Sequence, residues 1–262
     1  MLINMKLTFL GTGGGRYVTS AQKRATGGIH LELDGKSILI DPGPCSLCKA
    51  HQYRINPRYD ILCISHKHTD HTAGASAVIE AMTGSTREKR GTLICPAEVV
   101  KGSKKEPPVI NPYYPSLLSQ VTTLKPGQKT TCQGIEIKAT ATQHGDLEGI
   151  GFVFNKKLAY TGDTGYTPEI AEAMKGMDCI IINLISPNKQ EIPVLMTTPG
   201  AVKLLKTAKP KRAIITHFGM NMLKKGPENV ARILQETTGV PTTAAKDGMQ
   251  IDLTKKKVNE WR

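Results

Sequence analysis

The sequence predicts a mixed α/β (α+β) fold in which stacked β-sheets carry helices on their outer faces. Short apolar runs rich in β-branched residues recur along both halves of the chain, and segments rich in helix formers follow them. The chain has 262 residues, of which 39% are hydrophobic, and this is enough to bury one sizeable core. We therefore expect a single domain over residues 1–262.

The first half of the chain opens as antiparallel β-structure. The elements expected there are strands over residues 6–10, 28–33, 36–40 and 60–65 and a helix over residues 73–82. Glycines at residues 11–15 form a turn, after which we expect a strand-like region. Asp34-Gly35 is a turn pair of the kind that joins two antiparallel strands.

A long excursion separates the two halves. Between residues 84 and 119 the pattern weakens and five prolines occur, so we expect one short strand over residues 92–95 within a segment that borders the site. After it we expect strands over residues 121–124, 134–142, 149–155, 157–161, 179–184, 213–216 and 248–253, and helices over residues 168–174, 198–208 and 227–238. Both halves are thus rich in strands and carry helices.

The composition is that of an ordinary globular protein. The chain has no apolar run of eighteen or more residues and no signal-peptide core, so we expect no membrane span and a cytoplasmic location. Its six scattered cysteines are expected to be reduced. The net charge of +13 favours RNA or a small phosphate-bearing substrate, although lysines spread along helices are also typical of solvated faces. Denser basic clusters at residues 87–90, 101–105 and 255–257 are candidate contacts.

The residues that carry chemistry begin at the end of the strand over residues 60–65. The run His66-Lys67-His68-Thr69-Asp70-His71 places three histidines and one carboxylate within six positions. Imidazole nitrogens and carboxylate oxygens suit zinc and related divalent ions, whereas a purely structural zinc site more often uses cysteine. In an extended segment His66 and His68 point to the same side, and the following turn can aim Asp70 and His71 at a second position.

Four ligands do not complete two metal sites, so further ligands are expected at other strand ends. His144, Asp163 and His217 each follow a predicted strand. Five of the seven histidines therefore lie at such positions, and only His30 and His51 do not. Each of the five could singly be an ordinary core or surface histidine, but together they indicate a metal centre.

With these motifs the sequence resembles the metallo-β-lactamase superfamily. The run from His66 to His71 matches its HxHxDH motif, and His144, Asp163 and His217 match its later motifs in order. The opening TFLGTGGG, the segment Leu39-Ile40-Asp41-Pro42-Gly43 and the ending AAKDGM resemble the branch that contains tRNase Z and the cyclic phosphodiesterases.

The resemblance implies a four-layer αββα sandwich with two divalent metal ions at one edge. Zinc is the expected metal, and Mn²⁺ and Fe²⁺ are alternatives. It assigns His66, His68 and His144 to one ion, Asp70, His71 and His217 to the other, and Asp163 to a bridging position. Asp41 matches a residue that supports the ligands from behind by hydrogen bonding. From sequence alone Asp41 could equally be a turn aspartate before Pro42.

Two neighbouring cations imply a hydrolytic mechanism. They would lower the pKa of a bridging water, so that hydroxide forms at neutral pH, and would stabilise charge on the scissile phosphoryl or carbonyl group. Asp70 is the candidate catalytic residue, because it could accept a proton from that water in addition to its ligand role.

Weaker signals have alternative explanations. The glycine turn lacks the lysine and spacing of a phosphate-binding loop, although Arg16 or Arg24 could contact a phosphate. Cys45 and Cys48 form a CxxC pair without a second pair, which favours two reduced thiols. Three further residues are candidates for the surroundings of the site: Asp146 beside His144, and Asn221 and Lys224 after His217.

The leading hypothesis for function is a dinuclear phosphodiesterase acting on a small or cyclic phosphodiester. An RNA 3′-processing endonuclease of the tRNase Z type is the alternative. The long arm that such members carry is not expected within residues 164–216, and no histidine occurs near Thr197 where their motif has one. A non-enzymatic RNA- or partner-binding protein with structural metals is a third hypothesis, and β-lactams and thioesters stay open as substrates. Apart from the candidate contacts named above, the substrate-binding residues are unknown; a homodimer is compatible with the sequence.

Overall fold

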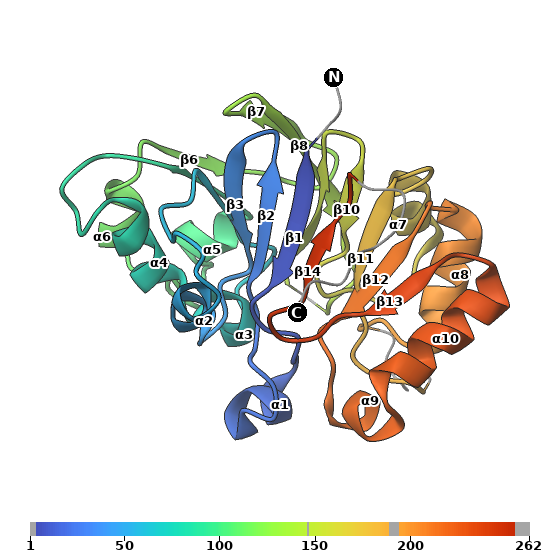
Figure 1. Cartoon of the computed structure of the whole chain (residues 1–262). Coiled ribbons are helices and arrows are strands. Elements are labelled where there is room, and N and C mark those ends of the chain that lie inside the picture. Colours follow the sequence, from blue (N-terminus) through green and yellow to red (C-terminus); the bar gives the residue numbers. More distant parts are fainter. Residues whose placement is uncertain (1–3, 146, 189–193, 255–262) are drawn as a thin grey trace.

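The computed structural model describes residues 4–145, 147–188 and 194–254 and has two packed seven-stranded sheets (Figure 1). The strands of the first sheet, in spatial order, are β14 (Gln250–Asp252), β1 (Met5–Phe9), β2 (Ile29–Leu33), β3 (Lys36–Ile40), β4 (Ile61–Cys63), β5 (Thr92–Cys95) and β6 (Gln120–Thr123). Those of the second are β13 (Thr242–Ala244), β12 (Ala213–Thr216), β11 (Cys179–Asn183), β10 (Leu158–Tyr160), β9 (Ile150–Phe154), β8 (Ile135–Ala141) and β7 (Lys129–Cys132).

Helices flank both sheets (Figure 1). Those of the first half are α1 (Arg16–Ala21), α2 (Ser46–Gln52), α3 (Thr69–Thr72), α4 (Ala75–Met82), α5 (Ala97–Lys101) and α6 (Tyr113–Ser116). Those of the second half are α7 (Pro168–Ala173), α8 (Thr198–Ala208), α9 (Met220–Lys225) and α10 (Pro227–Thr238). The result is the predicted sandwich of two sheets between helices.

The two halves have the same strand pairing, which the sequence did not reveal. The ladders β1–β2 and β2–β3 are antiparallel, and β3–β4, β4–β5 and β5–β6 are parallel. The strands from β8 to β13 repeat this order, with two antiparallel ladders followed by three parallel ones. Asp41 after β3 and Asp163 after β10 therefore occupy equivalent places in the two halves.

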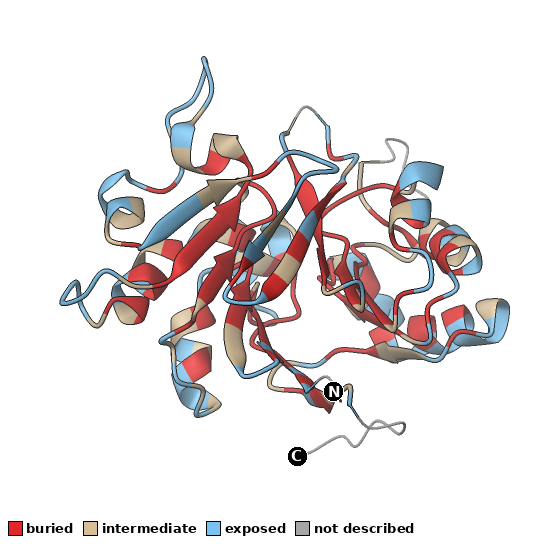
Figure 2. Ribbon diagram, turned by 90° about the horizontal axis from the view of Figure 1, so that it is seen from above, coloured by how far each residue is buried: buried red, intermediate tan, exposed pale blue. Residues whose placement is uncertain are grey.

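Buried apolar side chains form three core clusters. Figure 2 shows that the strands are largely buried. Alternate residues of β1, namely Met5, Leu7 and Phe9, face the second sheet and pack in the core between the sheets. A second cluster packs α7, α8 and α10 on the outer face of the second sheet, and a third packs α4 on the first. Burial on both faces explains why strands such as β11 are continuously apolar.

Local sequence accounts for the ends of several elements. Asp34 and Gly35, both with positive φ (49° and 78°), join β2 to β3 in the tight turn expected of an Asp-Gly pair. Pro199 lies in the first turn of α8, where a missing N–H costs nothing. Gly239 ends α10 in the left-handed conformation.

Some elements differ from the sequence prediction. The strand-like region expected after the glycine turn is wrong: this segment is α1, begun at Gly15, whose carbonyl accepts hydrogen bonds from Thr19 N (3.0 Å) and Oγ1 (2.8 Å). The excursion over residues 84–119 holds α5 and α6 in addition to the predicted strand β5. The short elements β7, β13 and α9 were not predicted, because three to six residues give too little periodicity.

The remaining expectations concern the cysteines, membrane spans and the extent of the domain. All six cysteines are unpaired, as predicted. Among the described residues, no helix is both long and apolar enough to cross a membrane. The basic cluster at residues 255–257 lies outside the described residues, and a single domain over residues 1–262 stays a prediction.

Candidate metal centre

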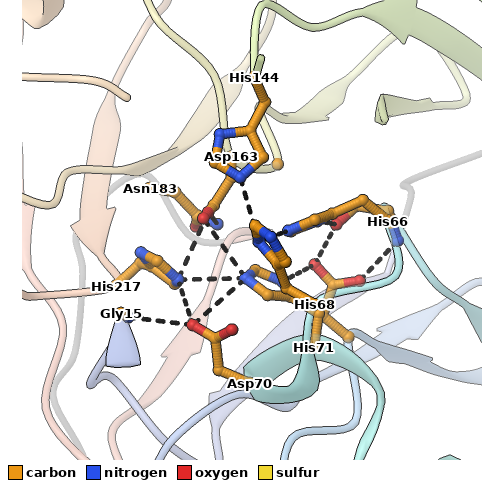
Figure 3. A network of polar contacts seen from close by, with 12 residues as sticks. Gly15, His66, His68, Asp70, His71, His144, Asp163, Asn183 and His217 are labelled. Atoms are coloured by element: carbon orange, nitrogen blue, oxygen red, sulfur yellow. Dashed lines mark hydrogen bonds and ion pairs between the residues drawn. The ribbon is translucent and has the colours of Figure 1, made fainter. Parts of the chain in front are cut away.

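The seven residues that the sequence singles out come together at one edge of the sandwich, from segments that follow strands of both sheets (Figure 3). In the first sheet, β4 leads to His66 and His68, and α3 carries Asp70 and His71. In the second sheet, residues after β8, β10 and β12 supply His144, Asp163 and His217. Parallel strands end at the same edge of a sheet, so distant segments meet there.

The first cluster consists of His66, His68 and His144. The Nδ1 atom of His68 lies 3.0 Å from His66 Nε2 and 3.2 Å from His144 Nε2. The Nδ1 atoms of His66 and His144 each have a hydrogen-bond partner elsewhere. Ser65 Oγ, which donates its proton to Asp41, accepts from His66 Nδ1 at 3.0 Å, and the Val194 carbonyl accepts from His144 Nδ1 at 2.9 Å.

This arrangement turns the lone pairs of His66 Nε2 and His144 Nε2 toward the same point. His68 Nδ1 has at most one proton, so it can satisfy only one of them. A cation at that point satisfies all three nitrogens, and three imidazoles with an open fourth position form a usual zinc ligand set. The residues therefore fit a divalent metal ion.

The second cluster consists of Asp70, His71 and His217. His217 Nε2 lies 3.1 Å from His71 Nε2 and 3.2 Å from Asp70 Oδ2. His71 Nδ1 donates to Asp41 Oδ2 at 2.8 Å, and this orients its Nε2 toward the cluster. His217 adopts the left-handed backbone conformation, with a φ of 61°.

Asp163 lies between the two clusters. Its Oδ2 is 3.6 Å from His71 Nε2, its Oδ1 is 3.4 Å from His217 Nε2, and it groups with His66 and His71 as a third possible ligand set. The side chain is buried, with 5% of its surface exposed. Its oxygens contact His71 and His217 of the second cluster, and its grouping with His66 places it within 4.8 Å of a nitrogen of the first, so Asp163 can bridge two ions.

A buried hydrogen-bond chain that sequence reasoning missed joins Asp41 to Asp163. Asn183 Nδ2 donates to Asp163 Oδ1 (2.8 Å) and to Tyr160 Oη (2.9 Å), and Tyr160 donates to Asp41 Oδ2 (2.6 Å). In the sequence both residues are simply the last members of apolar strands. Asp41 itself accepts from Ser65 N (2.6 Å), Ser65 Oγ (2.7 Å) and His71, so it orients His71 and the segment that leads to His66.

The residues that form these contacts lie within the part of the chain that matches a known family. The profile of the beta-lactamase superfamily domain matches residues 36–218, which span the whole cluster from Asp41 to His217. The chain belongs to the metallo-β-lactamase superfamily.

Relatives in the superfamily match over most of the chain. The chain is 32% identical over 257 residues to the uncharacterized protein MJ1374 of Methanocaldococcus jannaschii, with 96% of each protein covered. It is 25% identical over 231 residues to ribonuclease Z of Sulfolobus acidocaldarius, covering 71% of this chain and 77% of that protein.

Solved structures agree on the metallo-β-lactamase sandwich. A diphosphatase from the PhnP family superposes with a TM-score of 0.71 at 19% identity, covering 98% of this chain and 100% of that one. At this identity the likeness shows the shared fold. Membership of the superfamily places the chain among metal-dependent hydrolases.

The electrostatics of the centre favour bound cations. Burial lowers the pKa of both His66 and His68, so these imidazoles stay neutral, as metal ligands must be. Burial alone raises the pKa of Asp163, but His217 and His71 outweigh it and hold the pKa well below its usual value. The Asp70 pKa is lowered by the same balance, in which His71 and His217 outweigh burial.

His71 shows the opposite balance. Burial lowers its pKa, but the carboxylates of Asp163, Asp70 and Asp41 outweigh burial and raise it well above the usual value. Three carboxylates thus concentrate negative charge around this imidazole. Divalent ions compensate such charge directly, and they compete with the proton for His71 Nε2.

The glycine turn at residues 11–15 lies so close to the second cluster that it leaves no room for a side chain at residue 14. Gly14 N donates to the Phe218 carbonyl at 3.2 Å, and a Cβ added at Gly14 would lie 2.3 Å from His217 Cγ. Gly15 N donates to Asp70 Oδ2 at 3.0 Å. The turn therefore packs directly against two residues of the second cluster, which requires the absence of a side chain at residue 14.

Gly14→Ala is accordingly expected to displace the His217 ring and weaken metal binding at the second cluster by about 10-fold to 100-fold, the range for disturbed ligand support. Metal titration of the chelated protein measures this. Gly200→Ala in α8 is the matched control, because its Cβ meets Met196 Sδ at 3.0 Å, Tyr166 Cβ at 3.3 Å and Thr197 Oγ1 at 3.7 Å, none of which belongs to the two clusters. Equal affinity in both variants would contradict the steric role.

The other residues named from sequence lie elsewhere or serve the fold. Arg24 Nη1 donates to Thr12 Oγ1 (3.0 Å) and the Ala245 carbonyl (3.2 Å), so it links the glycine turn to the segment after β13, and its phosphate contact stays a prediction. Arg16 is exposed at the start of α1, beside Gly15. Asn221 and Lys224 are exposed on α9. Asp146 lies outside the described residues, and Cys45 and Cys48 start α2 as separate thiols.

Proposed function

We propose that the protein is a dinuclear metal-dependent phosphodiesterase that hydrolyses a small or cyclic phosphodiester, with zinc as the metal and manganese or iron as alternatives. The observation that carries this proposal is the convergence of seven imidazole and carboxylate side chains into overlapping ligand groups. A site with that many ligands exceeds what one structural ion requires.

The ligand roles follow the distances. His66, His68 and His144 would hold one ion, Asp70, His71 and His217 the other, and Asp163 both. Two ions held there would activate water for attack and neutralise charge on the phosphoryl oxygens. Asp41, Ser65 and Val194 fix the ring orientations of the histidines.

Asp70 is proposed as a ligand first and as a proton acceptor second. Its carboxylate oxygen Oδ2 receives the Gly15 N–H and faces His217. Its lowered pKa keeps it ionised at neutral pH, which suits a ligand, but a carboxylate with so low a pKa holds a transferred proton only weakly.

Charge and relatives support phosphate chemistry as the reaction. The net charge of +13 attracts phosphate-bearing substrates, and the Sulfolobus acidocaldarius relative is a ribonuclease Z. That relative also makes RNA 3′-end cleavage the second candidate function. In the described part of residues 164–216 we find α7, β11, α8 and β12 with their connections, and no additional arm.

The first test is metal content with phosphodiester hydrolysis. We expect close to two metal ions per chain by plasma mass spectrometry, hydrolysis of bis(p-nitrophenyl) phosphate, and loss of this activity after chelation with recovery on adding Zn²⁺. Parallel assays with cyclic nucleotides and with precursor tRNA separate the two candidate substrates.

Three outcomes would count against the proposal. If no metal binds after reloading, the proposal that these residues form a metal centre is wrong. Metal without turnover of any phosphodiester would favour another ester. Metal without turnover of any substrate, together with RNA binding, would favour the non-enzymatic hypothesis.

A further inference from the structure

One carboxylate outside the proposed ligand set links the segments that carry the first cluster. Glu98 lies on α5, just beyond the end of β5, which is the parallel neighbour of β4. Its Oε1 accepts a bond from Lys67 Nζ at 2.5 Å, and its Oε2 accepts from the Glu148 backbone N–H at 3.3 Å. Lys67 stands between His66 and His68, and Glu148 follows His144 by four residues.

These contacts join the two segments that carry the three histidines of the first cluster. His66 and His68 come from the first sheet and His144 from the second, so their rings meet only if the two segments keep a fixed separation. Glu98 bonds both segments, one through each carboxylate oxygen. Its side chain is only 11% exposed and that of Lys67 only 17%, so water competes weakly for this pair.

The surroundings hold Glu98 in place. Gly102 N donates to the Glu98 carbonyl at 3.0 Å, and Ser103 N donates to the Glu106 carbonyl at 2.8 Å. A Cβ at Gly102 would lie 2.5 Å from that Glu106 carbonyl oxygen, so only glycine permits the tight return of the chain. Glu106 also bonds Lys67 Nζ, but its side chain is 58% exposed, and within the described part of the chain its carboxylate does not bond the segment that follows His144.

We infer that Glu98 is a positioning residue that sets the spacing of the three-histidine cluster through Lys67 and the Glu148 N–H. This inference rests on the proposed metal ligands, and it gives the excursion over residues 84–119 a function. It concerns the first cluster alone, since in the second cluster Gly15 bonds Asp70, Asp41 bonds His71, and His217 contacts Asp70.

The test compares Glu98→Gln, Glu98→Ala and the control Glu106→Ala in the full chain. Glutamine has one acceptor oxygen and can keep only one of the two links, whereas alanine loses both. Titration of the chelated protein with Co²⁺, followed by visible absorption, reports the affinity of each site. We expect one site to weaken by several-fold in Glu98→Gln and by at least about 10-fold in Glu98→Ala, with the other site unchanged.

The control separates positioning from simple loss of a salt bridge. Glu106→Ala removes the other carboxylate from the same lysine and should leave both affinities within about 2-fold, as for an exposed ion pair. Equal effects of the two alanine variants, or equal weakening of both sites, would overturn the inference.

A second measurement is independent of metal. Hydrogen exchange of the Glu148 amide in chelated protein should accelerate in Glu98→Ala and stay unchanged in Glu106→Ala. Failure of the wild-type protein to bind Co²⁺ at these residues would refute the proposed function, whereas unchanged exchange in Glu98→Ala would refute the positioning role by itself.

Discussion

His68→Ala is expected to reduce bis(p-nitrophenyl) phosphate hydrolysis by more than about 100-fold and to lower the metal content from near two ions per chain to near one. His68 Nδ1 is the nitrogen that both His66 and His144 face, so its removal opens the first cluster completely. Loss of a ligand should exceed the 10-fold to 100-fold cost that is typical for loss of a residue supporting a ligand. Plasma mass spectrometry and steady-state kinetics measure both effects.

His51→Ala is the matched control for this variant. His51 is exposed on α2 and takes no part in the cluster, so activity and metal content should stay at the wild-type level. Wild-type turnover in His68→Ala, or an equal loss in both variants, would contradict the assignment of His68 as a ligand.

Asp41→Ala is expected to lower the free energy of unfolding of the chelated protein by about 3–5 kcal/mol, the usual cost of removing one partner from a buried ion pair. The Asp41 carboxylate accepts from Ser65 N, Ser65 Oγ, His71 Nδ1 and Tyr160 Oη, all within 2.8 Å. Alanine leaves these donors buried and unpaired. Urea unfolding without metal isolates this effect from metal loss.

Asp41→Asn tests whether charge or shape dominates at this position. Asparagine retains the volume and one acceptor oxygen, so its cost should be clearly smaller than that of alanine. A change below about 1 kcal/mol in Asp41→Ala would show that water or neighbouring groups satisfy the four donors, and the supporting role of Asp41 would have to be abandoned.

Much of the fold could be predicted because the strands are buried and end in polar residues. Strands such as β11 and β12 are short apolar runs, and α8 and α10 were predicted with the bounds that the structure shows. The histidines and aspartates that follow the strands could be assigned to one site because both residue types are common ligands of divalent metal ions. The structure brings all seven together.

The rest depends on contacts that no local pattern records. Tyr160 and Asn183 belong to apolar strands, and only the pairing of β10 with β11 brings them between Asp41 and Asp163. Nothing in the sequence distinguishes Glu98 from other charged residues, and its contact with Lys67 depends on the position of α5 in the fold. The segment of α1 misled the prediction because tyrosine, valine and threonine favour strands, whereas Gly15 and Thr19 close a helical turn there.

Each candidate ligand cluster takes side chains from both sheets, so metal bound there would tie the lifetime of the protein to metal supply. An ion that binds only the folded chain adds about 4 kcal/mol of stability when it is present at a thousand times its dissociation constant. A cell short of metal would therefore hold a chain that opens more often at this edge and is degraded faster. Scarcity would reduce the number of molecules as well as the activity of each one.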